Sequence, residues 1–288
     1  MRSDIELLRI VSAFGIVWFH SGVSFGHEIS YGGIIAFVIL SAYFAMISNK
    51  TDLLPKVFRL LIPCLVWAII YAGFKYVRGV DVFPQDLNFI SKILTTPSIH
   101  LWYLPFIFFV VLFINMLKKY LPVNIIGISS VFIAIIIILI APIWRELNFI
   151  SPFGQWAHAF SAVFIGIFFG AADKINSKLF YSSLLLVFAS IVYVTILKVE
   201  DFGVTYLAGF IPCLILLSRS SLIKKNRIIL TLSSTTLGIY LLHILVLFVL
   251  QYLGVVGFLF PIMAFVLSLI IVYISKMILP KSISIYFL

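Results

Sequence analysis

The sequence predicts an all-α protein, a polytopic bundle of about ten transmembrane helices, and three observations support this. The 288 residues are 63% hydrophobic and only 10% charged, with a mean hydropathy of +1.22, far more apolar than an ordinary globular domain. Apolar runs recur along the whole chain, and each is close to the roughly 20 residues with which a helix crosses the hydrocarbon core. The runs are continuous rather than alternating, which favours helices over a membrane barrel.

Short polar connections separate the ten expected spans. The spans cover residues 5–25, 29–48, 57–77, 100–117, 125–141, 158–172, 181–197, 204–218, 230–251 and 258–279. The first contains Arg9 and His20 and lacks a small-residue cleavage pattern, so we expect it to remain as a span rather than to be removed as a signal peptide. The two longest connections, 78–99 and 142–157, contain proline and aromatic residues and predict short interfacial helices over a cavity.

The distribution of basic residues predicts the orientation. A cytoplasmic N-terminus puts the C-terminus in the cytoplasm too, and it leaves outside only five of the 20 lysines and arginines, which are Lys75, Arg78, Lys92, Arg145 and Lys198. This is the positive-inside pattern, so the net charge of +10 does not indicate a nucleic-acid partner. We expect a multi-pass protein of the cell inner (cytoplasmic) membrane, with residues 1–288 forming a single transmembrane domain and no appended soluble domain.

The two cysteines do not predict a metal or disulfide site. Cys64 and Cys213 lie in apolar segments without the spacing of zinc ligands, so packing roles are expected and no metal cofactor is implied.

Ionisable residues within spans are energetically costly, which makes Arg9 and His20 functional candidates. They lie eleven residues apart, about 16 Å along a helix and on nearly the same face. A basic group near the inner surface and a deeper imidazole fit a long anionic ligand that enters from the cytoplasm. The spacing alone also allows a different interpretation, in which Arg9 reaches lipid phosphates and His20 is a satisfied core histidine.

Lys56 and Arg59 form a second pair of cations at a predicted inner boundary. Their i, i+3 spacing suits phosphate binding, although a basic flank that follows the positive-inside rule has the same pattern.

Two further segments place polar or aromatic groups at unusual positions. His243 lies deep in an apolar span, in the string LGIYLLH with Tyr240 three residues before it, so it needs a partner or a cavity. His100 and Trp102, in the string HLWYL, lie at an expected outer boundary, where an aromatic belt and carbohydrate stacking are both open interpretations.

No acidic residue is expected inside a span to orient His20. The acidic residues considered lie at outer ends or in connections, and they are Glu28, Asp81, Asp86, Glu146, Glu200 and Asp201. Without a carboxylate, the tautomer of His20 is expected to depend on a backbone carbonyl, Ser12, Ser41 or Tyr43.

The order of these strings resembles the membrane acyltransferase-3 family, whose members include bacterial O-acetyltransferases of surface polysaccharides. Arg9 and His20 are similar to its signature of Arg, ten residues, His. FVILSAYF at 37–44 resembles its second-helix string with Ala42 in place of Gly, and KVFRLLIP at 56–63 resembles its Arg-x-x-Arg region with Lys56 as the first cation. HLWYL at 100–104 and LGIYLLH at 237–243 match its later strings in order.

The resemblance implies a membrane-bound O-acyltransferase that moves an acyl group, typically acetyl, from cytoplasmic acyl-CoA to a hydroxyl of a cell-surface or lipid-linked carbohydrate. It implies His20 as the catalytic residue and Arg9, Lys56 and Arg59 as ligands of the CoA phosphates. Acetyl-CoA or another acyl-CoA is then the donor, and the partners are the carbohydrate acceptor and membrane lipid. The sequence leaves open a homo-oligomer or a separate extracytoplasmic partner.

Two chemical routes and one rival function remain open at this point. His20 can act as a general base on the acceptor hydroxyl, or it can carry the acyl group covalently. His100, Trp102, Tyr240, His243, Ser41 and Tyr43 are expected to shape the site or bind substrate. The alternative is a transporter or flippase of a lipid-linked saccharide, against which the expected absence of acidic residues from the spans counts.

Overall fold

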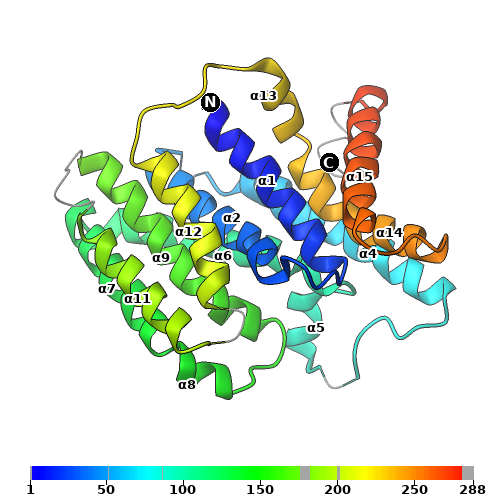
Figure 1. Ribbon diagram of the computed structural model, residues 1–288, viewed down its shortest axis with the longest axis horizontal. Coiled ribbons are helices and arrows are strands. Elements are labelled where there is room, and N and C mark those ends of the chain that lie inside the picture. Colours follow the sequence, from blue (N-terminus) through cyan, green and yellow to red (C-terminus); the bar gives the residue numbers. More distant parts are fainter. Residues whose placement is uncertain (1, 51, 86, 176–181, 200–201, 281–288) are drawn as a thin grey trace. The chain divides into compact units, whose positions relative to one another are not determined.

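The structure is a computed structural model that describes residues 2–50, 52–85, 87–175, 182–199 and 202–280 (Figure 1), and every regular element in these ranges is helical. Five helical segments there are long and apolar enough to cross a membrane. They are α2 (His27–Ile47), α3–η1–α4 (Leu54–Val77), η2–α6 (Ile99–Tyr120), α9 (Phe153–Ile175) and α15 (Leu259–Ile278). The expected all-α membrane class is thereby confirmed.

A sixth crossing arises if α13 (Arg227–Ser233) and α14 (Thr236–Tyr252), bent by 52°, form one broken span. The other predicted spans also coincide with helices, which are α1 (Ser3–His20), α7 (Val123–Leu139), α11 (Leu184–Ile196) and α12 (Gly203–Leu217). Of these, α1 carries three charged residues, and α7, α11 and α12 have 17, 13 and 15 residues, short of the roughly 20 of a full crossing. Ten crossings and cytoplasmic termini therefore stay predictions.

Large apolar side chains remain exposed along the candidate spans. Ile69 in α4 is 72% exposed and Met277 in α15 is 71% exposed. In water such surfaces would cause association, whereas hydrocarbon tails cover them without cost. The exposed apolar surface therefore agrees with a multi-pass membrane protein.

Both long connections form short helices, as the sequence predicts. The first contains α5 (Phe89–Thr95), where the Asn88 side chain accepts a hydrogen bond from the Ser91 backbone N–H at 2.8 Å and so caps the helix. The second contains most of α8 (Ala141–Glu146). The positions of Asp86, Glu200 and Asp201 lie outside the described residues.

The described chain divides into two compact units. Unit 1 contains the residues up to Leu40 and those from Thr195 onward, which include α1, the first two thirds of α2, and α12 to α15. Unit 2 contains the residues from Ser41 to Val194, which include the end of α2, α3 (Leu54–Lys56), η1 (Val57–Leu61), α4 (Ile62–Val77), η2 (Ile99–Trp102) and α6 (Tyr103–Tyr120) to α9.

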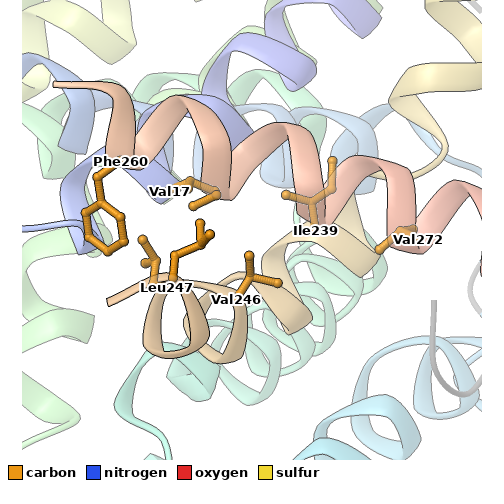
Figure 2. Packing of buried hydrophobic residues seen from close by; sticks show 8 residues of the cluster. Val17, Ile239, Val246, Leu247, Phe260 and Val272 are labelled. Atoms are coloured by element: carbon orange, nitrogen blue, oxygen red, sulfur yellow. The ribbon is translucent and has the colours of Figure 1, made fainter. Parts of the chain in front are cut away.

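In unit 1, α1 packs against α13, α14 and α15. Figure 2 shows the apolar cluster that joins α1, α14 and α15, in which Val17, Leu247 and Phe260 are buried. Among membrane helices such a cluster is stabilised by close packing of the side chains rather than by their removal from water. This cluster supports the end of α1 and the middle of α14, which carry the histidines described below.

Glycines bring α1, α2 and α12 close together. A Cβ atom at Gly33 would lie 2.4 Å from the Ser12 carbonyl oxygen of α1. A Cβ atom at Gly209 of α12 would lie 2.6 Å from Ile35 Cβ and 2.7 Å from the Gly32 oxygen of α2. Small residues allow such backbone approach between membrane helices, so these contacts set the distances between α1 and α2 and between α2 and α12.

In unit 2, α7 packs along α9, and the two run side by side in Figure 1. The end of α2 is held by Lys118 of α6, whose Nζ donates hydrogen bonds to the carbonyl oxygens of Ala45 at 2.9 Å and Ser48 at 2.8 Å. A cation at a helix C-terminus satisfies carbonyls that have no helical donor and opposes the negative end of the helix dipole. Lys118 therefore stabilises the C-terminus of α2.

Candidate active site

His20 is the last residue of α1, and it lies among histidines of unit 1. Its ring centroid is 5.2 Å from that of His243 in α14, with 44° between the ring planes. His27, the first residue of α2, lies near this end of α1, where its ring packs on that of Phe19 at 4.4 Å. In the part of the chain that is described, no group of three or more histidine, cysteine or acidic residues is arranged to hold a metal ion.

The first helix ends five residues earlier than its predicted span, which was expected to reach residue 25. Gly22 and Gly26 have φ angles of 74° and 69° in the connection that follows His20. Glycine adopts this left-handed conformation readily because it has no Cβ atom, so the chain reverses there and α2 begins at His27. His20 consequently lies at a helix end rather than in the middle of a helix.

His243 is fully buried in α14, as its position in an apolar run predicts. Its Nδ1 lies 2.6 Å from the Tyr240 carbonyl oxygen and 3.2 Å from that of Ile239. The ring of Tyr240 is also close, at 6.1 Å between centroids. The structure thus brings together His20, His243 and Tyr240, three of the residues that the sequence singles out.

Arg9 lies on α1 eleven residues before His20, and it is paired with an acid. Its Nη1 donates a hydrogen bond to Glu6 Oε2 at 2.9 Å, and the same oxygen accepts one from the Ser233 hydroxyl. Glu6 is buried, and it lies within the first predicted span. The expectation that the spans contain no acidic residue is therefore wrong. The charge of Arg9, one helical turn away, compensates that of Glu6 and so allows the acid to be buried there.

The start of α1 is fixed by a second ion pair. Arg2 donates to Asp4 Oδ2 at 2.8 Å and to the carbonyl oxygens of Leu216 and Arg219 at the end of α12. Asp4 also accepts a hydrogen bond from the Leu222 backbone N–H at 3.0 Å. These bonds connect the first turn of α1 to the segment that follows α12, within unit 1.

Lys56 and Arg59 lie in unit 2, at a change of helix type. Lys56 ends α3 and Arg59 belongs to the π-helical segment η1. The i→i+5 hydrogen bonds of a π-helix differ from those of the regular α-helix that the i, i+3 spacing assumes. Lys56 Nζ donates to the Lys50 carbonyl oxygen at 3.3 Å, and Arg59 is exposed. Their joint action with Arg9 on one ligand stays a prediction.

Ser41 and Tyr43 make hydrogen bonds within unit 2. The Ser41 and Tyr103 hydroxyls are 2.9 Å apart, and the Tyr43 hydroxyl donates to Asp173 Oδ2 at 3.2 Å. These bonds connect the end of α2 to α6 and α9, so both side chains have a structural function whatever their part in a reaction. The Ser12 hydroxyl of α1, by contrast, is buried without a hydrogen-bond partner among the described residues.

His100 and Trp102 form part of the interior of unit 2. His100 is 2% exposed, its Nδ1 lies 2.8 Å from the Ser98 hydroxyl, and its ring meets that of Tyr71 edge-on at 5.1 Å. Trp102 is 7% exposed and packs on Phe106 at 5.5 Å. Neither side chain faces lipid, so the interpretation as an aromatic belt is wrong. A role in binding the acceptor stays a prediction.

Comparison with known protein families shows to which family this chain belongs. A family model described as an acyltransferase domain matches residues 2–279. The chain belongs to the acyltransferase-3 family. The match confirms the resemblance carried by Arg9, His20 and the later strings, and it covers both units, so this multi-pass protein is a membrane acyltransferase. Searches of curated proteins and of solved structures give no significant match.

Sequence reasoning missed two groups at the candidate site, Glu6 and His27. Glu6 precedes Arg9 by three residues, a spacing that places two side chains on one face of a helix, so the pair was available from the sequence. His27 follows His20 by seven residues, but only the turn at Gly22 and Gly26 brings it near.

Proposed function

We propose that this membrane acyltransferase transfers an acyl group, in the simplest case acetyl, from cytoplasmic acyl-CoA to a hydroxyl of a cell-surface or lipid-linked carbohydrate at the inner membrane. The contact of the His20 and His243 rings carries the proposal, because it sets an imidazole base next to a second buried imidazole. The family match supports the reaction class. Acyl-CoA as the donor, a carbohydrate hydroxyl as the acceptor and the inner membrane as the location are proposed here in addition to the reaction class.

Arg9 supports acyl-CoA as the donor. Its side chain is 23% exposed although it is paired with Glu6, and a guanidinium has five N–H donors, of which the ion pair occupies one. The remaining donors suit the diphosphate of CoA. Arg9 and His20 are eleven residues apart on α1, about 16 Å, a separation comparable with an extended pantetheine arm. Lys56 and Arg59 are proposed to add charge for the same phosphates.

In the reaction, an unprotonated ring nitrogen of His20 takes the proton of the acceptor hydroxyl as its oxygen attacks the thioester carbonyl carbon. The tetrahedral intermediate then expels the CoA sulfur, the C–S bond breaks, and the proton on His20 passes to the thiolate. The products are an O-acyl ester and CoA with a free thiol. No atom or electron is supplied from outside.

A covalent acyl-histidine is the second chemical route. There His20 itself attacks the thioester, and the acceptor hydroxyl later attacks the acyl-imidazole. The two routes differ in one observable, because only the covalent route releases CoA in a burst before the acceptor is added.

A transporter of a lipid-linked saccharide is the rival function. Glu6 is an acid inside α1, the kind of group that a proton-coupled carrier uses. Its carboxylate is already bound by Arg9 and Ser233, an arrangement that favours a fixed structural ion pair over a group that loads and releases protons.

The test is acyl transfer by the purified protein in lipid nanodiscs, with radiolabelled acetyl-CoA and an extract of surface carbohydrate. We expect label in the carbohydrate and free CoA thiol. The His20→Ala variant should lose about 10²–10⁴-fold in rate, the usual contribution of general base catalysis, with an unchanged elution volume and unfolding midpoint. Saccharide movement across vesicles without thioester consumption would instead establish the transporter.

The acceptor is identified from cells. Mass spectrometry of surface carbohydrate from cells with and without the protein should differ by the mass of one acyl group per modified residue. Identical spectra from cells that express the protein and cells that lack it would contradict a surface carbohydrate acceptor. The transferase reaction itself is tested by the assay in nanodiscs.

A further inference from the structure

The hydrogen bonds of His243 fix the tautomer of its ring. Its Nδ1 lies 2.6 Å from the Tyr240 carbonyl oxygen and 3.2 Å from that of Ile239. A carbonyl oxygen only accepts hydrogen bonds, so Nδ1 carries the hydrogen and donates it. In a neutral imidazole the other nitrogen then has a lone pair. His243 is therefore built to offer Nε2 as an acceptor.

The position of His243 makes this assignment stable. Both carbonyls belong to its own helix, one turn before it, and the residue is 0% exposed. Rotation of the ring would take the Nδ1–H away from both carbonyls within a packed interior, where an unsatisfied N–H costs about 1–3 kcal/mol. The acceptor nitrogen consequently keeps one direction.

His20 is the titratable group that faces His243 from α1. The ring centroids are 5.2 Å apart, a separation that a hydrogen bond between ring nitrogens, or one bridging water, can span. Two imidazoles this close in an apolar interior carry at most one positive charge between them, since two positive charges would repel strongly. When His20 takes a proton in the reaction, His243 must stay neutral.

The other charged groups near this pair do not replace His243. His27 approaches His20 from the start of α2, and Glu28 beside it is exposed. On α1, Glu6 is bound to Arg9 and Ser233 and lies fourteen residues from His20, about 21 Å along the helix. Among the groups named here, the imidazole on α14 is the one whose ring contacts that of His20, in the place that a carboxylate takes in many histidine-dependent enzymes.

We propose that His243 is the positioning residue of His20. In this arrangement, which rests on the proposed function, Nε2 of His243 accepts a hydrogen bond from one N–H of His20, directly or through one water. The opposite nitrogen of His20 is then unprotonated and turned toward the acceptor hydroxyl. When that nitrogen takes the hydroxyl proton, the Nε2 lone pair stabilises the imidazolium until the proton passes to the departing thiolate. His243 exchanges no proton with the substrate.

The direct test is ¹⁵N NMR of the folded protein with labelled histidine, in nanodiscs and without substrate. The chain has five histidines, so single His→Gln variants at His27, His100 and His158 help to assign the signals. We expect His243 protonated at Nδ1 and a single tautomer for His20. In the His243→Leu variant His20 should populate both tautomers. Protonation of His243 at Nε2 would overturn the proposal.

Kinetics provide the second readout. His243→Leu fills a buried apolar site, so its unfolding midpoint should stay near the wild-type value while kcat falls about 10²-fold or more and the KM for acyl-CoA is unchanged. His243→Gln offers an amide oxygen as acceptor and should recover roughly tenfold of the lost rate. The acid limb of the kcat/KM profile should also move in both variants. Tyr252→Phe, at an exposed position at the end of α14, is the control.

The outcomes separate this proposal from the proposed function. If the wild type transfers acyl groups, His20→Ala abolishes transfer and His243→Leu keeps the full rate with an unchanged pH profile, the positioning role is wrong and the transferase stands. If no acyl-CoA is consumed at all, the proposed transferase function is wrong. The NMR measurement still tests whether His243 orients His20, because it requires no acyl donor.

Discussion

Arg9 and Glu6 form an ion pair on one face of α1, with 2.9 Å between Nη1 and Oε2, and Ser233 of α13 donates to the same carboxylate oxygen. The pair joins a group proposed to bind the donor to a helix that lies far away in the sequence. It also explains how a carboxylate can occupy the first predicted span at acceptable cost, since it is compensated and hydrogen-bonded.

Glu6→Gln should lower the free energy of unfolding by about 1–3 kcal/mol, because the charge-assisted bond from Arg9 is lost while an oxygen remains for Ser233. Unfolding in detergent measures the change. Glu28→Gln, at an exposed position on α2, is the control and should have little effect. A double-mutant cycle with Arg9→Met should give a coupling energy; strictly additive effects would show that the pair contributes nothing.

Lys118→Met should destabilise the protein by about 2 kcal/mol, since two carbonyl oxygens at the end of α2 lose a charged donor. Lys119→Met removes the neighbouring cation, which is exposed, and should change stability by less than about 0.5 kcal/mol. Thermal unfolding of both variants is the measurement. Equal shifts would indicate a general effect of charge and would contradict the capping role of Lys118.

Gly209→Ala should cost about 1–3 kcal/mol, because the added methyl group would collide with Ile35 and with the Gly32 backbone, and α12 would have to move away from α2. Gly73→Ala in α4 is the matched change, because no atom lies within 4 Å of the new methyl group. It should stabilise the helix by roughly 0.5–1 kcal/mol. The opposite signs of the two shifts are the expected result, and a shift of the same sign in both would refute the close contact.

The predicted orientation is tested with single cysteines in a variant without Cys64 and Cys213, both of which are free and buried. Ser220→Cys lies in the basic connection that contains Lys224 and Lys225 and should react with an impermeant maleimide only in inside-out vesicles. Asp81→Cys should react only in intact cells. Reversed labelling would invert the orientation and with it the side from which acyl-CoA enters.

Much of this protein followed from the sequence alone. Hydropathy located all ten apolar segments, and each coincides with a helix, because backbone polar groups in hydrocarbon must be satisfied within the segment. The spacing of Arg9 and His20 on one helix and the burial of His243 were also available from the sequence, since helical periodicity is local and an imidazole in a long apolar run needs an interior. The order of five strings predicted the acyltransferase family, which the family match confirms.

The partners of these residues were decided by the tertiary structure. The turn at Gly22 and Gly26 ends α1 at His20, and the packing of α1 on α14 places His243 beside it, in the first and ninth of the expected spans. Helical periodicity shows which face of each helix carries the buried and ionisable side chains, but not which helix faces pack against each other. That pairing depends on how side chains of several helices fill space together, as in the cluster of Val17 and Leu247, and this is settled only when the whole chain has folded.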